Sequence, residues 1–149
     1  MKNVLSIICF VISASTFSQS QDLNGVNLNA PMGFIKTGDY LWEKGNDMIL
    51  VASVGRKLSE KEIKASITVD TRGTTHIMLR NTFINGKNYP LSFNEGINGK
   101  LILMTGFNFE NSFYTIVTGV EPNDYNGQEE YFAAALYNIE YMIARFLYF

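Results

Sequence analysis

The sequence predicts an α+β fold, in which helices sandwich an antiparallel sheet in an α/β/α arrangement and a long C-terminal helix closes the chain. Residues 74–84 alternate apolar and polar side chains, and residues 48–52 are apolar throughout, which are the two patterns of β-strands. Asn85-Gly86 is the strongest short signal for a hairpin between two strands. Residues 128–147 repeat apolar side chains at steps of three and four, which is the period of an amphipathic helix.

Length and composition exclude several classes of protein. The chain has 149 residues, of which 46% are hydrophobic and 17% charged, so it suits one globular domain with a sizeable core. Its 12 basic and 14 acidic residues give a net charge of -2, which leaves no basic excess to bind a nucleic-acid backbone. A single cysteine and a single histidine exclude disulfide frameworks, Cys/His zinc sites and Cys–His dyads. We therefore expect no nucleic-acid partner, no metal and no cofactor.

Residues 1–18 have the pattern of a secretory signal peptide. Lys2 precedes an apolar stretch, residues 4–12, which is shorter than the roughly 20 residues that span a bilayer. Small residues suit cleavage before Gln19, and Gln21 offers an alternative mature start. We expect a periplasmic or secreted protein that keeps no membrane span after cleavage. The alternative is a retained N-terminal anchor.

The mature chain is expected to begin with a flexible lead-in, residues 19–31, because this stretch has few large apolar side chains. A single α+β domain then covers residues 32–149. Turn-forming residues separate three short strands, expected at residues 33–35, 40–42 and 48–54.

A short helix is expected after Ser59. Glu62 follows three residues later, which is the spacing of a capping box, and Ile63 and Ile67 then fall on one helical face. Residues 67–69 would suit a strand equally well, because they are rich in β-branched side chains.

The predicted hairpin joins residues 74–84 to residues 87–93. Strict alternation divides the first strand into two faces, of which one belongs to the core and the other is partly exposed. The two sets are Thr75, Ile77, Leu79 and Phe83 on one side, and His76, Met78, Arg80 and Thr82 on the other. Pro90 places the return strand at an edge or a bulge.

Two further strands, residues 100–107 and 113–120, are expected at the centre of the sheet. Three of the predicted strands are apolar on consecutive residues, so both faces of the sheet need a cover. The helix at residues 128–147 can cover one face, and the sandwich prediction assigns a second cover to the other.

This order of elements resembles the group of small exported domains that includes the photosystem protein PsbP, the bacterial periplasmic protein DcrB and the nuclear transport factor Mog1. The closing helix contributes to the resemblance, together with three short segments. They are Gly33-Phe34, Tyr40-Leu41-Trp42 and Ile97-Asn98-Gly99-Lys100. Members of the group serve mostly as accessory or binding modules, so the resemblance implies the same role here.

Four residues are candidate binding residues. His76 and Arg80 lie four apart on one predicted strand face, where they could form a proton-transfer pair or an anion site. An ordinary, partly exposed strand face explains the same two residues. Tyr40 and Trp42 belong to a rich aromatic set that could line a pocket or an interface, or pack in the core.

An oxygen-rich cluster before the last helix is the remaining candidate. Asp124, Asn126, Glu129 and Glu130 could hold calcium, although Pro122 occupies the place of the first ligand of an EF-hand. Helix capping and the helix dipole explain the same residues without a metal.

No sequence motif of an enzyme is present, and no catalytic residue is predicted. We expect an exported, non-enzymatic accessory or binding domain that acts through protein contacts in the periplasm or envelope. The alternative is a small-ligand carrier with an aromatic pocket between sheet and helix.

Export gives the first testable prediction. Mass spectrometry of the native protein should find an N-terminus at Gln19 or Gln21, because a signal peptidase removes the preceding segment. An intact Met1 on protein recovered from the cytoplasm contradicts it.

Overall fold

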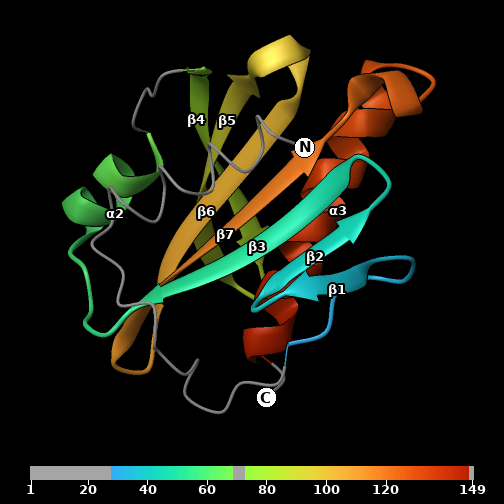
Figure 1. Cartoon of the computed structure of the whole chain (residues 1–149). Coiled ribbons are helices and arrows are strands. Elements are labelled where there is room, and N and C mark those ends of the chain that lie inside the picture. The colour runs from blue at the N-terminus through green and yellow to red at the C-terminus, as the bar shows by residue number, and fades with distance from the viewer. Residues whose placement is uncertain (1–27, 69–72, 148–149) are drawn as a thin grey trace.

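The computed structural model describes residues 28–68 and 73–147 (Figure 1). The predicted signal peptide and the lead-in up to residue 27 lie outside the described residues. No helix within the described ranges is long and apolar enough to cross a membrane.

Seven strands form one antiparallel sheet in the order β1-β2-β3-β7-β6-β5-β4. The strands are β1 Ile35–Gly38, β2 Leu41–Lys44, β3 Asp47–Val54, β4 Thr74–Ile84, β5 Lys87–Gly96, β6 Leu101–Phe109 and β7 Ser112–Val120. The helices within the described ranges are α2 Glu60–Ile67 and α3 Gln128–Leu147, and short 3-10 turns lie at Ile97–Gly99 and Pro122–Asp124. The α+β class, the antiparallel sheet and the long C-terminal helix are confirmed.

The central strands are β6 and β7, as predicted. All nine residues of β7 are buried, and the two strands pair along their whole length. Successive side chains of a strand point to opposite faces, so this pair fills two separate apolar clusters.

The larger cluster lies between the sheet and α3, which runs behind the sheet in Figure 1. Ile139, Ile143 and Phe146 of α3 are buried against it. The ring of Phe146 lies 4.8 Å from that of Tyr114 and 5.1 Å from that of Phe107, between ring centroids. Aromatic side chains therefore fill this interface with contacts to one another.

The opposite face carries α2 and a smaller cluster. The predicted capping box is confirmed, since the Ser59 N–H donates to Glu62 Oε2 over 2.7 Å and the Glu62 N–H donates to Ser59 Oγ. The hydrogen bond from the Ser59 N–H to the Glu62 carboxylate, followed by the one from the Arg56 guanidinium, lowers the pKa of Glu62. Ile67 at the end of α2 is buried with Met48 and Ile102. Because α2 has only eight residues, a complete helical layer on this face stays a prediction.

The predicted alternation of β4 is wrong at one point. The register shifts between His76 and Met78, which identifies a bulge at Ile77. The bulge changes the face on which later side chains lie, so His76 and Arg80 do not share a strand face.

After the bulge, the exposure of the two faces is the reverse of the prediction. The set that contains Arg80 and Thr82 faces α3, and the predicted core residues Leu79 and Phe83 face away from α3. On the α3 side, Thr82 Oγ1 donates to Glu140 Oε1 of α3 over 3.0 Å. Leu79 and Phe83 lie on the other side of the strand, and together with Ile77 at the bulge they are solvent-exposed: Ile77 by 50%, Leu79 by 39% and Phe83 by 68%. We call these three side chains the exposed strip.

A charge in the larger cluster should destroy the fold. Ile139 is fully buried, so Ile139→Asp should abolish cooperative unfolding, because an unpaired buried charge costs several kcal/mol. Tyr137 lies on the same helix but is 57% exposed, so Tyr137→Asp is the matched control and should melt like the parent. Equal melting curves for the two variants would show that α3 does not pack through Ile139.

Candidate functional site

Pro90 determines the shape of the sheet next to β4. The β5–β6 ladder runs from Glu95 only to Leu91, which pairs with Thr105, whereas the β4–β5 ladder continues to the Ile84–Lys87 pair. Proline has no N–H and cannot donate to a ladder. The end of the β4–β5 hairpin is therefore not bonded to β6. Pro90 was expected at an edge or a bulge, but β5 lies between two strands and Pro90 instead marks the end of one ladder.

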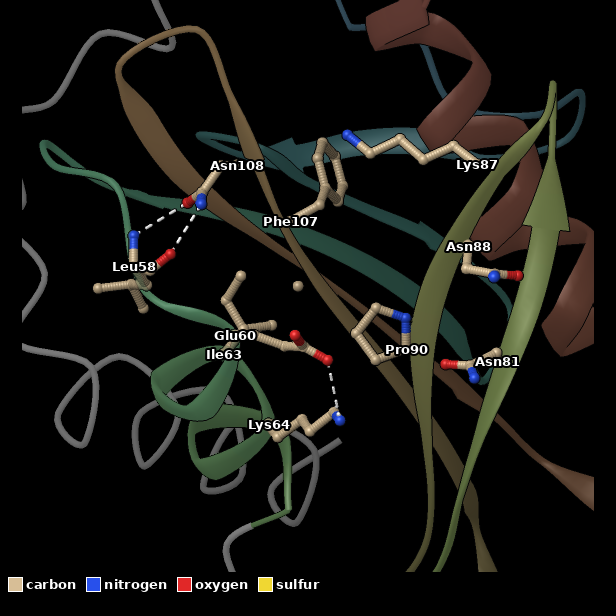
Figure 2. A pocket seen from close by; sticks show the side chains of 11 residues that line it. Leu58, Glu60, Ile63, Lys64, Asn81, Lys87, Asn88, Pro90, Phe107 and Asn108 are labelled. Carbon is tan, nitrogen blue, oxygen red and sulfur yellow. Dashed lines mark hydrogen bonds and ion pairs between the residues drawn. The ribbon is translucent and has the colours of Figure 1, made fainter.

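A cavity of about 410 Å³ lies between this end of the hairpin, β6 and α2 (Figure 2). We call it the hairpin cavity. Gly106 lines it, and a Cβ atom at this position would lie only 2.7 Å from the Phe113 ring. Its polar lining residues are Glu60, Lys64, Asn81, Lys87, Asn88 and Asn108.

Asn108 fixes one wall of the hairpin cavity. Its Oδ1 accepts from the Leu58 N–H over 3.0 Å, and its Nδ2 donates to the Leu58 carbonyl over 2.8 Å. Figure 2 shows both bonds, together with the 3.1 Å ion pair between Lys64 and Glu60. The two bonds attach the segment before α2 to β6.

The hairpin cavity is not the predicted aromatic pocket. Phe107 is the one aromatic residue that lines it, and its ring contacts Tyr89 edge-on at 5.5 Å between centroids. Tyr114 and Phe146 of the sheet–α3 interface contact each other in the core. The rest of the lining combines amide and charged groups with Leu58, Ile63 and Pro90, so aromatic side chains do not dominate it.

The structure does not bring the four predicted binding residues together. Trp42 is only 5% exposed and belongs to the core beneath α3. Tyr40 lies between β1 and β2, where the Lys36 ammonium is 5.8 Å from its ring centroid. The sheet order separates β2 from β4 by five strand spacings, which is about 24 Å at about 4.8 Å per strand.

His76 has two buried partners that the sequence analysis missed. Its Nδ1 lies 3.0 Å from Ser92 Oγ and 3.1 Å from Asn94 Oδ1. Both β5 residues are buried, and Ser92 is 0% exposed. The Ser92 hydroxyl therefore cannot reach a substrate in this conformation. The sequence does contain a signal for these polar positions, because Ser92 and Asn94 alternate with apolar residues along β5. Their pairing with His76 could not be predicted, because it depends on the register of β4 against β5.

Arg80 lies on the α3 side of β4. Its guanidinium carbon is 6.0 Å from the Phe93 ring centroid, which is a cation–π arrangement. Among the residues that the structure describes, Arg80 forms no ion pair.

The predicted oxygen-rich cluster is used for local hydrogen bonds. Asp124 Oδ2 accepts from Asn46 Nδ2 over 3.2 Å, and the Asn126 N–H donates to Glu130 Oε2. In the described part of the chain, no three acidic, histidine or cysteine side chains lie close enough to hold a metal ion.

A neighbouring hydrogen bond was not predicted. The Tyr125 hydroxyl donates to the buried Asp47, and burial together with this bond raises the pKa of Tyr125. Asp47 also accepts from the Glu121 N–H over 3.0 Å. This pair therefore attaches the loop before α3 to the start of β3.

No protein-family model matches this chain, and no curated protein is significantly similar to it. The resemblance to PsbP, DcrB and Mog1 stays a prediction. The candidate sites are therefore the exposed strip and the hairpin cavity, both on the β4–β5 hairpin.

The Asn108 contacts give a testable prediction. Asn108→Ala should lower the free energy of unfolding by about 1 to 3 kcal/mol, because it removes the partners of two main-chain groups of Leu58. Asn81→Ala is the control, since Asn81 also lines the hairpin cavity but is exposed on β4. Urea denaturation measures both, and equal midpoints for the two variants would contradict the role of Asn108.

Proposed function

We propose that this chain is an exported, non-enzymatic accessory or binding domain that acts through protein contacts in the periplasm or envelope. The observation that carries the proposal is the exposed strip on β4, at one end of the sheet order. Single exposed apolar residues are ordinary, but an apolar edge strand invites pairing and natural proteins usually protect it. Here the bulge and Arg80 interrupt β4, yet the strip stays exposed. We therefore assign protein contact to this edge.

Export is supported by the N-terminal pattern of Lys2 and the apolar stretch after it. The mature chain would contain no cysteine, which suits an oxidising compartment. A non-enzymatic role is supported by the burial of Ser92 next to the one histidine. The proposal keeps the predicted α/β/α sandwich and the resemblance to the PsbP, DcrB and Mog1 group.

A small-ligand carrier is the second candidate, and the hairpin cavity is the observation that favours it. Three asparagines and two lysines among its lining residues would bind a polar ligand, whereas the pocket first expected was lined by aromatic side chains. A ligand that raises the melting temperature of the parent but not of an Asn88→Ala variant would support this candidate.

Contact at β4 can be tested with a matched pair of positions. A benzoylphenylalanine photo-crosslinker in place of Phe83 should capture a protein in intact cells, because Phe83 is 68% exposed in the strip. The same crosslinker in place of Ile35 is the control, since Ile35 is 71% exposed on β1 at the other end of the sheet. Gel analysis with mass spectrometry identifies the captured protein.

Capture from both positions alike, or from neither, contradicts the assignment of contact to β4. A further control uses His76→Gln, which removes the titratable side chain and keeps hydrogen-bonding capacity. Capture through position 83 should survive this change. If His76→Gln eliminates the biological activity while the fold stays intact, a catalytic or pH-sensing site replaces the proposal.

A further inference from the structure

The hairpin turn determines which main-chain groups of β4 are open. Asn85 and Gly86 have φ values of 48° and 77°, which is the type I′ turn of a two-residue hairpin. The residues on either side of such a turn, Ile84 and Lys87, form a hydrogen-bonded pair. Alternate residues of β4 therefore bond to β5, and the residues between them turn their N–H and C=O groups outward.

This alternation assigns each residue from Met78 to Ile84 to one of two groups, paired or open. The paired residues, which bond to β5 like Ile84, are Met78, Arg80 and Thr82. The open residues, whose N–H and C=O groups face away from β5, are Leu79, Asn81 and Phe83. In the described part of the chain no strand pairs with this outer edge of β4.

Pro90 agrees with the assignment. It lies opposite Asn81 in the β4–β5 ladder. Because Asn81 is an open residue, the nitrogen of Pro90 must face β6, and the β5–β6 ladder indeed stops at Leu91.

The open residues are arranged symmetrically. The regular part of β4 lies between the bulge at Ile77 and the turn at Asn85, and Asn81 is its midpoint. A two-fold axis at Asn81 would pair Asn81 with itself and Leu79 with Phe83 of a second copy. Three open residues on each copy, each with one N–H and one C=O, would then form six main-chain hydrogen bonds.

The side chains on both faces fit such a pair. On the α2 side, exposed Leu79 and Phe83 of each copy would lie opposite each other and bury apolar surface. On the α3 side, Arg80 would lie opposite Thr82 of the second copy, whose hydroxyl donates to Glu140. Arg80 forms no ion pair within the described residues, so Glu140 of the second copy would give it a carboxylate partner.

We infer that β4 pairs antiparallel with β4 of a second copy about a two-fold axis at Asn81, which joins two sheets into one and gives each Arg80 the Glu140 of the other copy. The inference rests on the proposed function, because it names the partner at the same contact surface. Such an interface is isologous, since Leu79 contacts Phe83 in both directions.

Asn81→Pro tests the main-chain pairing directly. Proline removes the one N–H at the centre of the new ladder, and it leaves the β4–β5 bonds intact because Asn81 is an open residue. Asn81→Ala keeps the N–H and is the matched control. Sedimentation velocity of the exported protein should find a dimer for the parent and for Asn81→Ala, and a dimer at least tenfold weaker for Asn81→Pro. Circular dichroism should find all three folded.

Arg80→Glu and Glu140→Arg test the ion pair between copies. Each variant alone should dimerise at least tenfold more weakly, because like charges meet across the axis. An equimolar mixture of the two variants should recover a mixed dimer, since the side chains at positions 80 and 140 would then again carry opposite charges across the axis. If Arg80 instead paired with Glu140 of the same copy, mixing the two variants would not restore dimerisation.

Three results would overturn the inference. They are a parent protein that stays monomeric at millimolar concentration, a folded Asn81→Pro variant that dimerises like the parent, and a mixture of charge variants that stays monomeric. If the crosslinker at position 83 captures a different protein while the parent is monomeric, the inference fails and the proposed function stands. If position 83 captures nothing while the parent dimerises through another surface, both the inferred pairing and the proposed function fail.

Discussion

Every other element of the fold takes its place from the pairing of β6 with β7. Both strands are buried along almost their whole length, and their alternating side chains supply two apolar clusters on opposite faces of the sheet. One face must therefore accept α3, whose stripe is long enough to cover the central strands. The other face accepts α2 through Ile67. Strands farther from this pair receive less cover, and at the β4 edge Thr74 is the one buried residue of the strand.

Two irregularities turn that poorly covered edge into a candidate surface. The bulge at Ile77 exchanges the faces of the following residues, so apolar side chains that would pack under a helix are exposed instead. Pro90 ends the β5–β6 ladder and leaves room for the hairpin cavity. Neither feature improves the core. Both lie on the β4–β5 hairpin, so the two candidate sites, the exposed strip and the hairpin cavity, lie next to each other.

Local signals predicted much of the fold, because they act over a few residues. Ser59 with Glu62 predicted the start of α2, Asn85-Gly86 predicted the hairpin, and the period of the last helix predicted its bounds. The bulge at Ile77 has no comparable signal, since it depends on how β4 meets β5. The face of Arg80 relative to His76, and the burial of Trp42, follow from long-range pairing and could not be read from spacing.

Pairing between two copies requires that the outer edge of β4 is open in the single molecule and closes in the dimer. Amide hydrogen exchange, resolved by residue and measured in dilute and concentrated solution, tests this requirement most directly. We expect the amides of the paired residues to exchange slowly at both concentrations. The amides of the open residues should exchange fast in dilute solution and slowly in concentrated solution. Equal protection of both sets in dilute solution would contradict an open edge, because another strand would then already cover it.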